Sequence, residues 1–242
     1  MNTPAEEPTY QRKETFLFVG GLIAILVAIA FIGLNARVLG RSVAWTEILL
    51  LMSAFAVVAG RGITGSWRGI LIDHRYKIDL ARLQLMAWTV LILSALFTSV
   101  LDNIAGGSAT PLSIDIPSEL WILMGISTAS AVSAPLLMDR EKTGDAASQS
   151  SPVARNASFA AARWGDLLTG DETGRTETVD FGKLQMFFLS FILIISYGAA
   201  IAAMLKGTKV IDTLPTVDDG MNVLLGITHT GYLATKASMK SD

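Results

Sequence analysis

The chain has 242 residues, of which 51% are hydrophobic and 17% charged, and its mean hydropathy is positive. Soluble domains carry more charge, roughly a quarter of their residues, so this composition indicates a membrane protein. A net charge of −2 gives no support for a nucleic-acid partner, and the absence of cysteine excludes disulfides and thiolate metal sites. With only two histidines, we expect no metal site and no cofactor.

Six apolar segments follow one another along the chain, each about long enough to cross a bilayer core of roughly 30 Å. They cover residues 15–34, 43–60, 83–101, 120–138, 184–205 and 221–235. The last is the shortest and crosses only if the Lys236 side chain reaches the membrane surface. The first resembles a signal peptide, but its apolar run continues past the small residues Ala28 and Ala30, so we expect an uncleaved anchor.

Basic residues near the ends of the spans predict the orientation, because Lys and Arg concentrate on the cytoplasmic side. The segments after the second and fourth spans are rich in basic residues, whereas the segment between the third and fourth spans carries only acidic charges. We therefore expect both termini in the cytoplasm. Arg37 and Arg41, in the first outer loop, run against this rule.

Two parts of the sequence resemble each other over a long register. Residues 67–127 contain WRGILID, IDLARLQLM and SELWILMGIS, and residues 164–228 contain WGDLLTGD, VDFGKLQMF and MNVLLGIT. Asp79 aligns with Asp180, and a fainter copy begins at Thr46 with TEILLLMS. These patterns predict an all-α polytopic fold of six transmembrane helices, arranged as three hairpins repeated in parallel about an axis along the membrane normal.

The repeat divides the chain into four parts. We expect an N-terminal hairpin over 1–66, a second hairpin with an amphipathic cytoplasmic connector over 67–138, a flexible linker over 139–158 and a third hairpin with a matching connector over 159–242. The linker is predicted from its polar, small-residue composition. Asp79 and Asp180 each precede a helix, where a carboxylate caps free N–H groups, so both are predicted connector caps.

Acidic residues near the predicted outer ends of the spans are the first functional candidate. They are Glu47, Glu119, Asp218, Asp219 and Asp102. Gathered around a pore, such carboxylates attract cations, as acidic rings do in cation channels. However, Thr46 with Glu47, and Ser118 with Glu119, also match ordinary helix starts with a hydroxyl cap and an acid. Both interpretations stay open here.

The second candidate is a small and hydroxylated face on the fourth and sixth spans. Its members are Ser127, Thr128, Ser130, Thr228 and His229. Small residues let transmembrane helices pack closely, and the same polar groups would suit a water-lined pore. His229 is the only ionisable group well inside the sixth span, so it is either a proton-sensitive gate or a hydrogen-bonded histidine between helices.

Motifs of enzymes are missing from the sequence. We find no P-loop, no dinucleotide-binding glycine pattern, no zinc-protease motif and no hydrolase nucleophile elbow. The predicted spans also lack the paired ionisable residues that a membrane enzyme would need. We therefore predict no enzymatic activity and name no catalytic residue.

The hairpin pattern, with RLQLMAW or KLQMFF opening one span and LLGITHTGYLATKA closing the next, resembles a group of bacterial multi-pass inner-membrane proteins without an assigned activity. The resemblance covers about residues 67–237 and implies a bacterial inner-membrane location. The first hairpin departs from the pattern because it lacks the LQ pair.

Two functions fit these features. The first is a homo-oligomeric, cation-preferring pore or ion channel embedded in the lipid bilayer. The alternative is a non-conducting scaffold or anchor subunit that binds a cytoplasmic protein through its connectors and linker. The acidic outer ends and hydroxylated spans favour the pore, whereas the long polar segment 139–158 favours the scaffold.

Overall fold

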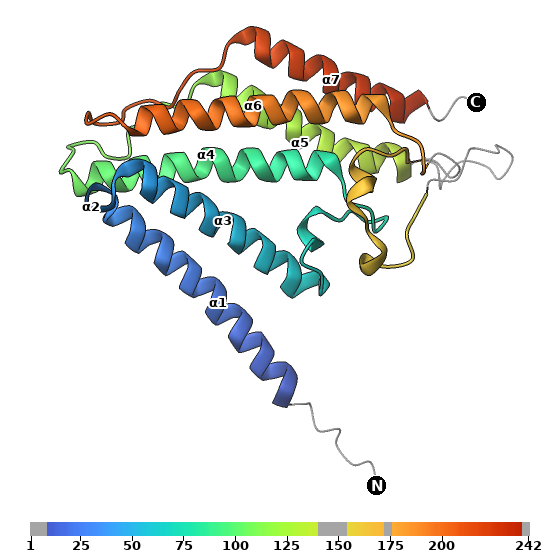
Figure 1. Ribbon diagram of the computed structural model, residues 1–242, viewed down its shortest axis with the longest axis horizontal. Helices are drawn as coiled ribbons and strands as arrows, with labels where there is room; N and C mark the ends of the chain where they lie inside the picture. The colour runs from blue at the N-terminus through green and yellow to red at the C-terminus, as the bar shows by residue number, and fades with distance from the viewer. Residues whose placement is uncertain (1–8, 140–153, 172–175, 239–242) are drawn as a thin grey trace, which may run out of the picture.

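The structure, a computed structural model, describes residues 9–139, 154–171 and 176–238, with side chains described for 18–132, 154–171 and 176–233 (Figure 1). Within these residues every regular element is a helix, and strand pairing is limited to isolated bridges. The α-helices are α1 (Thr9–Leu34), α2 (Ala36–Leu39), α3 (Arg41–Thr64), α4 (Leu80–Ala105), α5 (Ser118–Asp139), α6 (Phe181–Leu205) and α7 (Asp219–Ser238). The 3-10 helices are η1 (Gly69–Leu71), η3 (Phe159–Ala161) and η4 (Trp164–Leu167). The predicted all-α class is confirmed.

Three helices, α3, α4 and α6, are long and apolar enough to cross a membrane, which is the property expected of a membrane protein. The apolar stretches of α1 (Phe18–Leu34) and α5 (Ser118–Val132) are shorter. The sixth predicted span, 221–235, lies within α7. Six membrane spans therefore stay a prediction.

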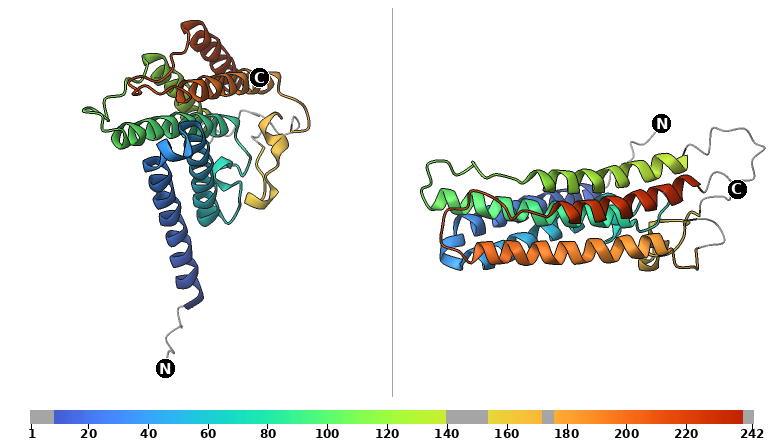
Figure 2. Two further views of the ribbon diagram at one scale, coloured as in Figure 1. Left: turned by 60° about the vertical axis from the view of Figure 1, so that its left-hand side comes forward. Right: turned by 90° about the horizontal axis from the view of Figure 1, so that it is seen from above.

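Four helices, α4 to α7, run side by side along the long axis of the molecule (Figures 1 and 2). Helix α4 is central, because it packs against α1, α3, α5 and α6. Helices α1 and α3 pack together as a hairpin that leans away from this bundle. The first connector (residues 65–79) and the second connector (residues 154–171 and 176–180) lie at one end, which we call the connector end.

Side-chain hydrogen bonds join neighbouring helices inside the bundle. In lipid, apolar surface alone does not drive helices together, so close packing and interhelical hydrogen bonds carry much of the association. The bonds join Trp45 to Ser94 (3.0 Å), Gln84 to Ser190 (2.8 Å) and Ser130 to His229 (2.6 Å). They connect α3 to α4, α4 to α6 and α5 to α7 respectively.

The end of α3 passes very close to the first connector at Gly60. A Cβ atom on Gly60 would lie 2.6 Å from the backbone nitrogen of Ile70, which belongs to η1. Gly69, in the first connector, is equally close to α3, because a Cβ atom added to it would lie 2.7 Å from the carbonyl oxygen of Gly60. The absence of a side chain at both positions is what lets the connector pack against α3.

We expect Gly60→Ala to lower the free energy of unfolding by about 1–3 kcal/mol, because the backbone of the connector must move to admit the methyl group. The matched control is Gly125→Ala, another helical glycine, where an added Cβ meets nothing within 4 Å. Reversible denaturation of the purified protein in detergent measures both. Equal stability of the two variants would contradict the close packing of α3 against the first connector at Gly60.

Candidate functional site: the ion-paired connectors

The first connector makes a tight loop between η1 and α4. Ile72 and Ile78 form an isolated antiparallel bridge, and the Asp73 N–H donates to the Lys77 carbonyl at 2.9 Å. The Asp73 carboxylate accepts hydrogen bonds from the backbone N–H groups of Arg75 and Lys77 and from the Arg75 Nε. Tyr76 closes the loop with a positive φ of 59°. The loop is thus held by one carboxylate at its centre.

The second connector has the same backbone bridge and hydrogen bond before α6 as the first connector has before α4. Thr169 and Val179 form the corresponding bridge, and the Asp180 N–H donates to Leu168 as the Asp79 N–H does to Leu71. Both predicted caps lie at helix N-termini in the structure. Asp79 accepts from the Arg82 N–H at 2.8 Å and Asp180 from the Lys183 N–H at 3.1 Å.

A buried carboxylate, Asp171, joins the two connectors. Its Oδ1 lies 3.1 Å from Arg75 Nη1, 3.5 Å from Lys77 Nζ and 3.0 Å from Lys183 Nζ. Its side chain is only 2% exposed, and those of the three cations are no more than 5% exposed. Removing one partner from such a buried network leaves uncompensated charge, which is strongly destabilising. Separating the connectors would therefore expose or unpair several charges at once.

Backbone contacts strengthen the same junction. Asp166, in η4, accepts from the backbone N–H of Ile78 in the first connector as well as from that of Arg163. The Arg68 guanidinium donates to the Ala162 carbonyl at 2.8 Å. The two connectors consequently behave as one folded unit at the connector end.

Charge and burial shift the proton affinity of two connector residues. Burial, with the positive charges of Lys183 and Arg75, lowers the pKa of Lys77 from 10.5 to about 8. Burial alone would raise the pKa of Asp73, but the Arg75 charge and the hydrogen bonds from Arg75 and Lys77 outweigh it and hold that pKa below its ordinary value.

An open cleft of about 550 Å³ lies between the connectors. It is lined by three basic side chains, Lys77, Arg155 and Arg163, and by the acids Asp166 and Glu177. The Arg155 guanidinium lies over the Tyr76 ring, 4.8 Å from its centroid. The adjacent Asn156 side chain donates to the Tyr76 carbonyl, and its N–H donates to the Arg75 carbonyl.

The predicted linker, 139–158, is only partly visible. Residues 140–153 lie outside the described residues. Residues 154–156, however, lie against both connectors, because the Ala154 N–H donates to the Asp171 carbonyl and Asn156 bonds to the first connector. The last part of this segment therefore contributes to the connector unit.

The predicted outer acids lie near the start of α3, the end of α4 and the starts of α5 and α7, but they differ in surroundings. Glu47 and Glu119 are half-buried in α3 and α5, while Asp218 and Asp219 are exposed at the start of α7. Asp102 is fully buried and paired with Arg41 (2.6 Å) and Arg37 (3.3 Å). Asp102 thus cannot act as an exposed mouth acid, because two guanidinium groups neutralise it.

The helix-start interpretation of Glu47 is wrong. Helix α3 begins at Arg41, more than a full turn before Thr46. Thr46 therefore does not cap the helix, and its hydroxyl donates to the carbonyl of Ser42, one turn earlier in the same helix. Glu119 does lie in the first turn of its helix, α5, where its carboxylate accepts from the Ser118 hydroxyl.

The hydroxylated face lies mainly in the contact between α5 and α7. Ser130 and His229 meet there, and Ser127 and Thr228 are buried. The Thr228 hydroxyl bonds to carbonyl groups of its own helix. Thr128 is the exception, because it is exposed and bonds to the Met124 carbonyl.

Sequence analysis missed the residues that hold the connectors together. In the sequence, Arg75, Lys77 and Lys183 stand out only as part of basic segments, and Asp171 only as the last residue of WGDLLTGD. The available signal is the strict alternation of charged residues with Tyr76 and Ile78 in RYKID, residues 75–79.

No family model, curated protein or solved structure matches the chain.

We expect Asp171→Asn to lower the free energy of unfolding by about 3–5 kcal/mol, because three buried cations lose their shared counter-charge. Glu177→Gln is the control, since Glu177 belongs to the same connector but is exposed. Denaturation in detergent at neutral pH provides the measurement. A loss no larger than that of the control would show that Asp171 does not hold the connectors.

We also expect the free energy of unfolding to change at alkaline pH because of Lys77. Between about pH 8 and 10.5 the unfolded chain holds a proton on Lys77 that the folded chain has released, so stability due to this residue rises with pH across that window. Below about pH 8 both states are protonated and its contribution is flat. Comparing wild type with Lys77→Met at both ends of the window tests this, and an unchanged pH slope in the variant would contradict it.

Proposed function

We propose that the chain is a six-span protein of the bacterial inner membrane, with both termini in the cytoplasm, that acts as a non-conducting scaffold or anchor subunit. Its connector unit binds a cytoplasmic protein partner. The observation that carries this proposal is the buried Asp171 network, which joins two connectors far apart in sequence into one body.

Several polar groups inside the helices support a scaffold rather than a conducting path through one chain. Trp45, Gln84 and Ser130 all bond to a neighbouring helix. Asp102 is likewise paired with arginine. Polar side chains that are used for helix pairing stabilise the fold and do not line water.

The connector cleft supports a protein partner with mixed charge. Arg155 and Arg163 offer donors for carboxylates, and Glu177 on the same wall offers an acceptor for a basic side chain. Trp164, 57% exposed, provides an aromatic surface beside the cleft. Aromatic residues and arginine are enriched where proteins bind one another.

We expect the double variant Arg155→Glu with Arg163→Glu to reduce the recovery of co-purified cytoplasmic protein by roughly tenfold or more, because reversed charges at an interface cost several kcal/mol. The measurement is quantitative mass spectrometry after crosslinking in native membranes and affinity purification. Lys209→Glu, an exposed cation at the opposite end, is the control. Equal recovery from all three proteins would contradict a partner at this cleft.

A second candidate, the oligomeric cation-preferring pore, is favoured by Thr128. Thr128 is exposed on α5, and a neighbouring copy of the chain packed against this face would cover it. Glu47 and Glu119 would then supply charge at the outer mouth.

If the chain conducts, liposomes with purified protein will show a cation-selective reversal potential under a salt gradient. Glu47→Gln with Glu119→Gln then weakens that selectivity, because the carboxylates that concentrate cations are gone. Liposomes that stay silent at both voltage signs and several pH values would remove the pore from consideration and leave the scaffold.

A further inference from the structure

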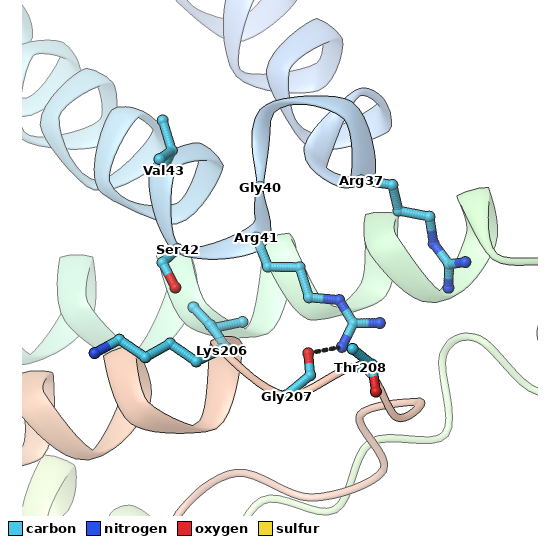
Figure 3. Close-up of a pocket in the computed structure, with 9 residues that line it drawn as sticks. Arg37, Gly40, Arg41, Ser42, Val43, Lys206, Gly207 and Thr208 are labelled. Atoms are coloured by element: carbon cyan, nitrogen blue, oxygen red, sulfur yellow. Dashed lines mark hydrogen bonds between the residues drawn. The ribbon is translucent and has the colours of Figure 1, made fainter.

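Arg37 and Arg41, which break the orientation rule, line a pocket at the end opposite the connectors (Figure 3). The pocket has a volume of about 440 Å³ and lies where α2 turns into α3, beside the end of α6. It is open to the surroundings and includes Lys206, Ser42 and Thr208 in its lining. Its lining contains three cationic side chains and no acid.

One arginine has a structural role and holds the pocket in shape. Arg41 pairs with Asp102 at 2.6 Å and donates to the Gly207 and Lys209 carbonyls at 2.8 and 2.7 Å. It therefore ties the start of α3 to the end of α4 and to the segment after α6. Figure 3 shows its bond to Gly207 across the pocket.

The charges around the pocket do not cancel. Asp102 is a single carboxylate shared by Arg37 and Arg41, so one positive charge remains in that group. Lys206 adds another, and it is exposed. Figure 3 shows the two guanidinium groups on one side of the pocket and the Lys206 side chain extending to the other. The pocket lining therefore carries net positive charge, with Lys206 at one side and the two arginines at the other.

The backbone adds donors to the same place. No side chain caps the start of α3, and Gly40, the residue before it, has a positive φ of 91°. The N–H groups in the first turn of a helix have no partner within the helix, and the helix dipole favours negative charge there. Ser42 and Val43 of that turn line the pocket.

Apolar side chains beside the pocket point to an amphiphilic ligand rather than a free anion. Val43 in the pocket lining is 51% exposed, and Val38 on the adjacent α2 is 87% exposed. Helices α3 and α6, whose ends form the pocket, are both long and apolar enough to cross a membrane. In a membrane crossed by α3 and α6, the pocket would lie where these helices leave the apolar layer, at the depth of lipid headgroups.

We propose that this pocket binds the phosphate-containing headgroup of an anionic phospholipid, with Arg37 and Lys206 contacting the phosphate and Val43 and Val38 contacting the acyl chains. This proposal is independent of the partner at the connector cleft. It also accounts for basic residues on a side of the membrane where they are uncommon, because a bound lipid phosphate neutralises them.

The test is native mass spectrometry of the full chain in mild detergent, with phosphatidylglycerol, phosphatidylcholine or inorganic phosphate added. Wild type is expected to retain phosphatidylglycerol in preference to phosphatidylcholine. Arg37→Gln with Lys206→Gln reduces that preference by roughly 10- to 30-fold, because each basic residue near an anionic headgroup contributes about a factor of five. Lys209→Gln, a cation outside the pocket lining, keeps it.

Equal retention of both lipids by wild type, or undiminished retention of phosphatidylglycerol by the double variant, would overturn the proposal. Binding of inorganic phosphate as tightly as phosphatidylglycerol would overturn the lipid as the ligand and leave a phosphate site. Arg41 is left unchanged in these variants because of its structural bonds. If the double variant does not fold, Lys206→Gln alone serves, with a loss of about fivefold expected.

Discussion

A carboxylate out of contact with water is stable only when opposite charges surround it, and Asp171 meets this condition through Arg75, Lys77 and Lys183. Two of these cations belong to the first connector and one to the start of α6. The network therefore determines where α6 begins relative to α4. Because the end of α3 packs against η1 at Gly60, the leaning α1–α3 hairpin depends on the same connector.

At the opposite end of the molecule a second buried carboxylate, Asp102, also holds helices together through an ion pair. Asp102, at the end of α4, holds Arg41 at the start of α3, and Arg41 in turn holds the chain that leaves α6. Helix α4 is thus anchored at both ends by charge, and between them by hydrogen bonds to α3 and α6. In a lipid environment, where apolar contacts alone do not drive association, such bonds define which helices are neighbours.

The two ends differ in what they present to the surroundings. At the connector end three cations, Arg75, Lys77 and Lys183, pair with buried acids, and the neighbouring cleft has a mixed charge suited to a protein surface. At the other end, two arginines share one acid, so positive charge remains beside apolar side chains and a helix start. This contrast supports the proposed protein partner at one end and the proposed lipid headgroup at the other.

The sequence by itself determined the helical class and the positions of the helices, because long uncharged runs leave few alternatives to a helix in an apolar medium. It also located the caps Asp79 and Asp180, since capping depends on neighbours close in sequence. Only the tertiary structure decided which charges meet. Arg75 and Asp171 are nearly a hundred residues apart, as are Ser130 and His229, and no local pattern encodes such a pairing. For the same reason Asp102 read as an outer acid in the sequence, whereas the folding of α3 against α4 buries it between two arginines.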